Sequence, residues 1–257
     1  MNDIITFMEK TILIAGKEYP EGSELASGAV LQGNTVVITS NPVVTEIKPE
    51  EGVTTVNWNK ISALSSRSLI ISALNVNGHL DEAVLVFDEE FLAPKYGNPG
   101  ASESNRAFDE LILSYQFLTT ELLLRYNQRK NAGLESKPGK IVFVYKSNMS
   151  EAQVVANPGL RIGSRTLSKS LVAAAGAASK AFAENMAASV CETDDVIPVL
   201  VECDPQNETA RKDSTLMKWL CEYLDQIDNL KKNLTPKQKV SWVKAGTKTP
   251  GGFGLFR

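Results

Sequence analysis

The chain has 257 residues, 43% of them hydrophobic, and its formal net charge is -3. This size suits a single α/β domain over residues 1–257. The acidic balance, with a pI near 5.4, argues against a nucleic-acid partner and against an anionic membrane surface. Three widely spaced cysteines without a C-x-x-C pair, and a single histidine, His79, favour neither a disulfide framework nor a metal site. We therefore expect a cytoplasmic protein with no bound metal.

Apolar runs separated by helical patterns predict an alternating order of strands and helices along the chain. Such an order predicts a doubly wound parallel sheet with helices on both faces, a three-layer α/β/α fold. The segments 43–51, 91–103, 128–138 and 147–170 are expected to be loops. The expected strands cover 11–16, 34–40, 53–58, 81–87, 140–145, 194–205 and 239–244, and the expected helices 25–32, 62–74, 105–127, 171–190 and 215–231.

The helix expected over 171–190 is rich in alanine, which favours a buried helix that packs closely against its neighbours. Its centre reads Gly-Ala-Ala-Ser-Lys over 176–180. This resembles the active-site helix of short-chain dehydrogenases/reductases (SDRs), which usually carries Tyr-x-x-x-Lys with Ala-Ser before the lysine. Lys180 matches the lysine of that motif, and Gly176 stands where the tyrosine belongs. The resemblance implies a single Rossmann-like domain with the proton donor replaced.

The first strand leads into a segment that resembles the glycine-rich turn of the same family, which holds a dinucleotide pyrophosphate. In Ala-Gly-Lys-Glu-Tyr-Pro-Glu-Gly over 15–22, Gly16 and Gly22 occupy glycine positions of that turn, and we take them as the candidate cofactor-binding residues. Such a turn needs glycine because backbone N–H groups must approach the phosphate closely. Pro20 replaces the middle glycine and removes a donor. Two glutamates add negative charge where an anion would sit, which predicts a weakened or lost cofactor site.

Residues after the next strands depart from the family pattern in the same direction. Ser40 follows the second strand, where an acidic or basic residue would read the adenosine ribose, so neither NAD nor NADP is indicated. The fourth strand continues as Phe-Asp-Glu-Glu over 87–90 in place of Asn-Asn-Ala-Gly. These carboxylates could form a cation site at the sheet edge, but we favour a solvated acidic face.

The remaining catalytic elements of the family are also altered. The family's catalytic serine ends the fifth strand or lies just past it, and this chain has Tyr145 and Lys146 there, with Ser147 and Ser150 next along. Ser147 is the candidate serine if the strand end is bulged, and an exposed loop hydroxyl is the alternative. No asparagine occurs between Arg106 and Tyr126, where relatives often supply one to a proton relay.

Two regions outside the chemistry match the family in position. The stretch of about 206–235 corresponds to the substrate lid and its helix. The helices 105–127 and 171–190 correspond to the pair that relatives use for their four-helix subunit interface, and both look intact. Residues 250–256 resemble the Gly-Gly-containing C-terminus that relatives pack against a neighbouring subunit.

These observations support three hypotheses. The first is a catalytically degenerate SDR-like protein that serves as a structural or regulatory subunit without a cofactor, either as a homo-oligomer or beside an active dehydrogenase. The second is an active NAD- or NADP-dependent oxidoreductase, of ketone/alcohol or 3-oxoacyl type, that uses displaced residues such as Ser147, Lys180 and Tyr145. The third is a small-molecule binding protein that reuses the crevice.

Overall fold

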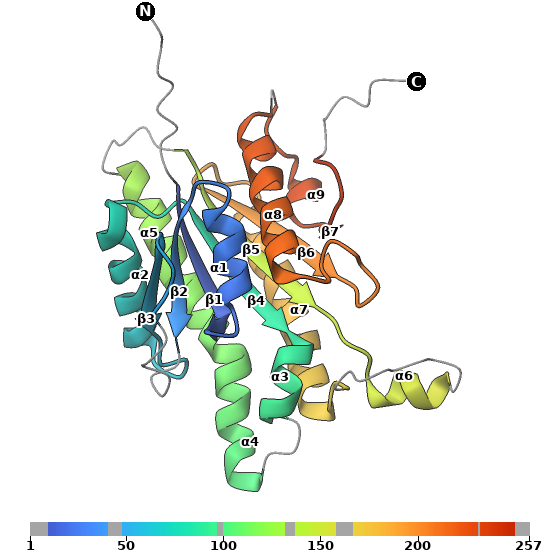
Figure 1. Ribbon diagram of the computed structural model, residues 1–257. Coiled ribbons are helices and arrows are strands. Elements are labelled where there is room, and N and C mark those ends of the chain that lie inside the picture. Colours follow the sequence, from blue (N-terminus) through green and yellow to red (C-terminus); the bar gives the residue numbers. More distant parts are fainter. Residues whose placement is uncertain are drawn as a thin grey trace, which may run out of the picture.

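The computed structural model describes residues 10–40, 48–96, 100–131, 137–157, 167–230 and 232–249. Within them the chain forms a seven-stranded, all-parallel sheet with the strand order β3-β2-β1-β4-β5-β6-β7. Helices cover both of its faces (Figure 1), so the predicted doubly wound α/β fold is confirmed. The strands are β1 (Thr11–Tyr19), β2 (Thr35–Ser40), β3 (Val53–Asn57), β4 (Glu82–Asp88), β5 (Gly139–Lys146), β6 (Val196–Cys203) and β7 (Trp242–Lys244).

Successive side chains of a strand point to opposite faces of the sheet, so each face forms its own hydrophobic core with its own layer of helices. One core joins β1 and β4 to α2, α5 and α7, and the other joins the same strands to α1 and α8. The α-helices are α1 (Ser23–Val30), α2 (Ala63–Asn77), α3 (Glu89–Tyr96), α4 (Ala101–Phe108), α5 (Ser114–Asn131), α6 (Glu151–Ala156), α7 (Ser170–Val190), α8 (Asp213–Asp228) and α9 (Pro236–Lys239).

The long helix predicted over 105–127 is interrupted by a π-helical turn, Asp109–Leu113, between α4 and α5. The loop predicted over 91–103 is partly wrong, because α3 runs from Glu89 through Pro94 to Tyr96. Burial of Leu92 and Ala93, 1% and 2% exposed, explains how a helix forms in spite of its proline. The predicted loop over 147–170 likewise contains α6, which has no buried residue and stands away from the body (Figure 1).

The first strand also departs from its prediction, since β1 continues past Gly16 to Tyr19. Tyr19 pairs with Ser40 of β2 after an irregularity in the register that begins beyond Ile14. The region predicted as a glycine-rich turn is thus mostly strand, followed by a short turn over 20–22. The segments 43–47, 97–99, 132–136 and 158–166 of the predicted loops, and 250–256 of the predicted C-terminal contact, lie outside the described residues.

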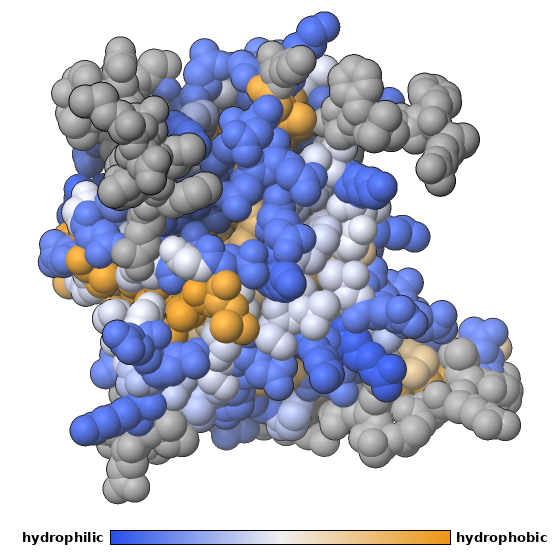
Figure 2. Space-filling view, turned by 45° about the horizontal axis from the view of Figure 1, so that its top comes forward, coloured by the Kyte–Doolittle hydropathy of each residue, from blue (hydrophilic) through white to orange (hydrophobic). Residues whose placement is uncertain are grey.

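The surface is mainly hydrophilic on the face seen in Figure 2, where hydrophobic side chains gather in small patches. Among the described residues, none of the helices combines the length and the apolar character needed to cross a membrane.

Candidate functional site

The strand order reverses between β1 and β4, so the chain leaves these two neighbouring strands toward opposite halves of the sheet. In open α/β sheets, ligands bind in the crevice outside the carboxyl ends of the strands at such a point. The candidate site is therefore the edge where β1, β4 and β5 end.

Four charged side chains meet at this edge and alternate in sign. Lys17 Nζ lies 2.9 Å from Asp88 Oδ2 and 2.6 Å from Asp213 Oδ2. Lys146 Nζ lies 3.2 Å from Asp88 Oδ2 and 2.5 Å from Asp213 Oδ1. We call this arrangement the charge ring: Lys17, Asp88, Lys146 and Asp213. It joins the ends of β1, β4 and β5 to the first residue of α8 and is electrically neutral.

The charge ring is mostly buried, which strengthens its electrostatics. Asp88 is 3% exposed, and burial alone would raise the pKa of its carboxyl. The ammonium groups of Lys146 and Lys17 outweigh burial and hold that pKa below its ordinary value. Burial likewise lowers the pKa of Lys17, but Asp88 and Asp213 raise it above the ordinary value. Asp88 and Lys17 are therefore both charged near neutral pH.

Gly16 and Gly22, the predicted cofactor residues, both make close packing contacts. Gly16 has a φ of 103°, and a Cβ there would lie 2.1 Å from the carbonyl oxygen of Val86 and 2.6 Å from the Tyr115 hydroxyl. A Cβ on Gly22 would lie 2.3 Å from the carbonyl oxygen of Lys17. Neighbouring backbone carbonyl groups thus leave no room for a side chain at either position, which accounts for both glycines.

Backbone groups at the start of α1 are also engaged by the chain itself. The N–H of Gly22 donates to the carbonyl oxygen of Glu18 at 2.8 Å, and that of Ser23 donates to Pro20 at 2.9 Å. The Glu18 carboxylate, 8% exposed, pairs with Lys60 and with Lys95. In this turn, two of the N–H groups that could bind a phosphate already donate hydrogen bonds to carbonyl oxygens of the chain.

Gly176 faces a tyrosine from another element. A Cβ on Gly176 would lie 2.7 Å from Glu89 Oε1 and 3.0 Å from the Tyr145 hydroxyl. Tyr145, at the end of β5, reaches over α7 and donates its hydroxyl to Glu89 Oε1 at 2.5 Å. Burial and the Glu89 carboxylate raise the pKa of Tyr145 above its ordinary value, which makes it a weaker acid. A tyrosine from β5 thus lies beside Gly176, where the sequence analysis expected the tyrosine of the motif, and its hydroxyl is bound to a carboxylate.

Glu89 is a buried acceptor that ties three segments together. Besides Tyr145, its carboxylate accepts hydrogen bonds from the N–H of Asn148 at 2.9 Å and from the Ser168 hydroxyl at 2.7 Å. The solvated acidic face predicted over 88–90 is therefore wrong, because Asp88 and Glu89 are 3% and 4% exposed. Only Glu90 fits that prediction, being exposed. Within the described ranges, no three His, Cys, Asp or Glu side chains are placed to hold a metal ion.

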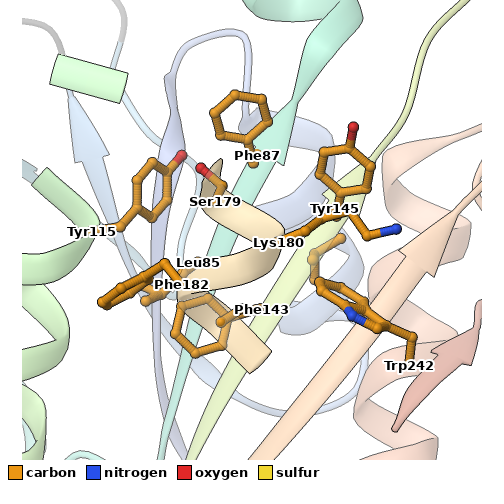
Figure 3. A pocket seen from close by; sticks show the side chains of 11 residues that line it. Leu85, Phe87, Tyr115, Phe143, Tyr145, Ser179, Lys180, Phe182 and Trp242 are labelled. Carbon is orange, nitrogen blue, oxygen red and sulfur yellow. The ribbon is translucent and has the colours of Figure 1, made fainter. Parts of the chain in front are cut away.

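Lys180, the candidate family lysine, points away from the charge ring toward β6 and β7. Its Nζ lies 2.7 Å from Glu202 Oε1 and 5.1 Å from the ring centroids of both Tyr145 and Trp242. Figure 3 shows the two aromatic rings on either side of the Lys180 side chain. The Trp242 ring is held in turn by a hydrogen bond from its Nε1 to Glu184 Oε1 at 2.6 Å. Lys180 thus fastens α7 to three neighbouring strands.

A small apolar pocket lies beside Lys180, lined mainly by aromatic side chains (Figure 3). The Ser179 hydroxyl is buried there without a hydrogen-bond partner in the described part of the chain. The pocket has a volume of about 20 Å³, which is room for one water molecule. It is too small to admit an organic substrate as it stands.

Ser147, the candidate serine, lies apart from Lys180. Its hydroxyl donates to the carbonyl oxygen of Cys203 at 3.2 Å, and Ser147 lines a polar groove on the other side of β5. The structure therefore brings Tyr145 to Lys180 and leaves Ser147 outside that pair. The charge ring was not predicted from the sequence. The signal that could have indicated it is Lys17, a cation inside the expected phosphate turn.

Comparisons with known proteins identify the fold. No family model matches the chain, and no curated protein sequence matches it significantly. Solved structures do match. A short-chain dehydrogenase from Mycobacterium smegmatis is 18% identical with a TM-score of 0.59, covering 94% of this chain and 93% of that one. A short-chain dehydrogenase from Leptospira borgpetersenii with bound NAD+ is 14% identical with a TM-score of 0.54, covering 90% and 83%.

A third match is the NADH-dependent reductase A1-R' complexed with NAD, 14% identical with a TM-score of 0.55, covering 84% of this chain and 88% of that one. At sequence identities this low, the similarity shows a shared fold and nothing more. The chain has the Rossmann-like fold of the short-chain dehydrogenases/reductases.

Proposed function

We propose that this chain is a non-catalytic subunit with the SDR fold, which binds no nicotinamide nucleotide and serves a structural or regulatory role in an assembly. The assembly forms with further copies of the chain or with an active dehydrogenase of the same fold. Two of the structural neighbours hold NAD, so a working reductase is the natural comparison. The proposal is based on the side chains of this chain at the corresponding crevice and at Gly176.

The observation that carries the proposal is the charge ring. In a doubly wound fold the dinucleotide pyrophosphate lies at the switch point, on free N–H groups at a helix N-terminus. Here Asp88 and Asp213 place two carboxylates at that edge, already paired with the lysines that could attract a phosphate. Removing one partner from a buried ion pair costs about 3 to 5 kcal/mol, and a comparable cost of separating these pairs would turn a micromolar site into a millimolar one. The residues present do not fit a dinucleotide.

The loss of a proton donor supports the same proposal. Gly176 has no side chain, and the hydroxyl of Tyr145 lies 3.0 Å from where its Cβ would be. A general acid must lose its proton during the reaction, yet the Tyr145 hydroxyl is held by the carboxylate of Glu89 and its pKa is raised. Lys180 would have to lower that pKa, but its ammonium pairs with Glu202 and lies over the face of the ring. This arrangement disfavours the active oxidoreductase.

The surface proposed for assembly is formed by α4, α5 and α7, which include the predicted pair 105–127 and 171–190. On α7 the exposed positions Ala174, Ala177 and Ala181 recur at helical spacing and carry no charge. Phe108, the last residue of α4, and Leu124, on α5, are 47% and 48% exposed. Small side chains on a helix let a second helix approach closely, and exposed apolar side chains favour burial against it.

A fluorescence titration with NADH and NADPH tests the cofactor half of the proposal. We expect no saturable change up to about 1 mM nucleotide, the range to which the cost of opening the charge ring moves a micromolar site. Saturation at micromolar nucleotide would overturn it, and oxidation of NADH in the presence of a carbonyl substrate would establish the active oxidoreductase instead.

Light scattering coupled to size-exclusion chromatography tests the assembly half. We expect the purified chain to be an oligomer and Ala177→Glu, which puts a charge on the α7 face, to dissociate it. Thr215→Glu is the matched control, since it adds the same charge at an exposed position of α8 on the other side of the sheet. A monomeric wild-type chain that also fails to join an active dehydrogenase would contradict this half.

A further inference from the structure

A polar groove lies outside the carboxyl ends of β4, β5 and β6, next to the charge ring. Its lining includes Asp88 and Lys146 from the ring and the segment 204–211 between β6 and α8. The groove has a volume of about 60 Å³, three times that of the apolar pocket beside Lys180. It lies on the edge of the sheet where ligands bind in this class of fold.

Hydrogen bonds brace the wall of the groove. The N–H of Gln206 donates to Asp204 Oδ1 at 2.7 Å, and the N–H of Ala210 donates to Asn207 Oδ1 at 3.1 Å. Asn207 Nδ2 donates in turn to the carbonyl oxygen of Ala245 at 2.8 Å, which ties the wall to the segment after β7. The groove is thus a preformed feature, which lowers the cost of ordering it around a ligand.

Two lining side chains of opposite charge remain available. Asp88 and Lys146 neutralise each other within the charge ring. Glu90 and Arg211 are exposed, and within the described ranges neither side chain has an ion pair or a hydrogen bond. The groove therefore presents the carboxylate of Glu90 and the guanidinium of Arg211, beside the exposed Asp204, whose Oδ1 accepts the N–H of Gln206.

The lining excludes several classes of ligand. A simple anion would face the carboxylates of Asp88, Glu90 and Asp204, and the described residues offer no site for a metal ion. Cys203, which also lines the groove, is 2% exposed, and burial raises the pKa of its thiol, so it is a weak nucleophile there. A ligand that carries both a positive and a negative charge can pair with Glu90 and with Arg211.

We propose that this groove binds the zwitterionic head of a free α-amino acid. The carboxylate pairs with the guanidinium of Arg211, whose planar fork suits it, and the ammonium pairs with Glu90. A volume of about 60 Å³ holds four or so water-sized groups, which matches the few non-hydrogen atoms of the head and leaves the side chain at the mouth. This site adds a ligand to the assembly role and does not depend on it.

An NMR titration of the full chain with L-alanine tests the proposal, followed by backbone amide shifts of segment 204–211. We expect saturable shifts with a millimolar dissociation constant, and no saturation with propionate or ethylammonium, which each keep one charge. Arg211→Gln and Glu90→Gln should each weaken L-alanine binding about tenfold or more. Lys218→Gln and Glu222→Gln, exposed on α8 and outside the groove lining, are the matched controls and should bind as wild type.

Three results would overturn the proposal: no shift in this segment at about 50 mM L-alanine, well above a millimolar dissociation constant; propionate or ethylammonium binding as tightly as L-alanine; or unchanged binding by both groove variants. All four variants lie on the surface and their folding is checked from the same spectra. The titration is independent of nucleotide binding, so the fate of the non-catalytic assembly role does not decide it.

Discussion

Replacing Asp88 by asparagine probes the charge ring directly. The substitution keeps the side-chain shape and an oxygen that can accept the N–H of Phe91, which lies 3.2 Å from Asp88 Oδ1. It removes the negative charge that Lys17 Nζ meets at 2.9 Å and Lys146 Nζ at 3.2 Å. Two lysines are then left to share Asp213.

The expected loss of stability follows from these contacts. Breaking a buried ion pair completely costs about 3 to 5 kcal/mol. Both lysines keep a carboxylate of Asp213, at 2.6 Å and 2.5 Å, so we expect about half of that, roughly 2 kcal/mol of unfolding free energy. Urea denaturation followed by circular dichroism measures the difference, and the slope against urea should not change. Glu222→Gln, at an exposed site on α8, is the control and should stay within about 0.5 kcal/mol of wild type.

The pH dependence of this difference has a defined sign. The pKa of Asp88 is lowered in the folded chain, so its charge stabilises the fold at every pH above its ordinary value of 3.8. As the pH falls below 3.8 toward the native pKa, the carboxyl takes up a proton and the advantage over Asp88→Asn disappears. A difference below about 0.5 kcal/mol at neutral pH, or one that persists unchanged at the lowest pH, would refute the reasoning.

Two further predictions concern α7. Gly176→Ala should lower the free energy of unfolding by about 1 kcal/mol, because the clash with Glu89 and the Tyr145 hydroxyl outweighs the gain in helix propensity. In a Tyr145→Phe background the same change should cost less. Equal costs in both backgrounds, measured by urea denaturation, would contradict this packing. Lys180→Met should lower the free energy of unfolding by about 1 to 2 kcal/mol, because it loses the aromatic contacts and the ion pair of Lys180. Lys218→Met, at an exposed position of α8, is the control and should change it very little. Equal stability of the two variants would contradict a structural role for Lys180.

The sheet and its helices were predictable because apolar runs and helical spacing reflect burial directly. The runs over 34–40, 81–87 and 140–145 became the buried strands β2, β4 and β5. The continuation of β1 past Gly16 was not predictable, because it depends on an irregular pairing of Tyr19 with Ser40. The π-turn at 109–113 is equally invisible in a pattern that reads as one helix.

From the sequence, Gly176 and Pro20 predict an altered proton donor and an altered phosphate-binding turn of the SDR type, but they predict no arrangement in their place. The charge ring joins Lys17, Asp88 and Asp213, which are as many as 196 residues apart. Such a cluster exists only once the strand ends meet at one edge, and no local pattern announces it.

We propose above all that the chain's own ion pairs fill the crevice where a dinucleotide would lie. Titration of the purified chain with NADH, read from the fluorescence of the nicotinamide, tests this claim most directly. We predict a response that stays linear up to about 1 mM nucleotide. A saturable response with a micromolar dissociation constant would contradict it.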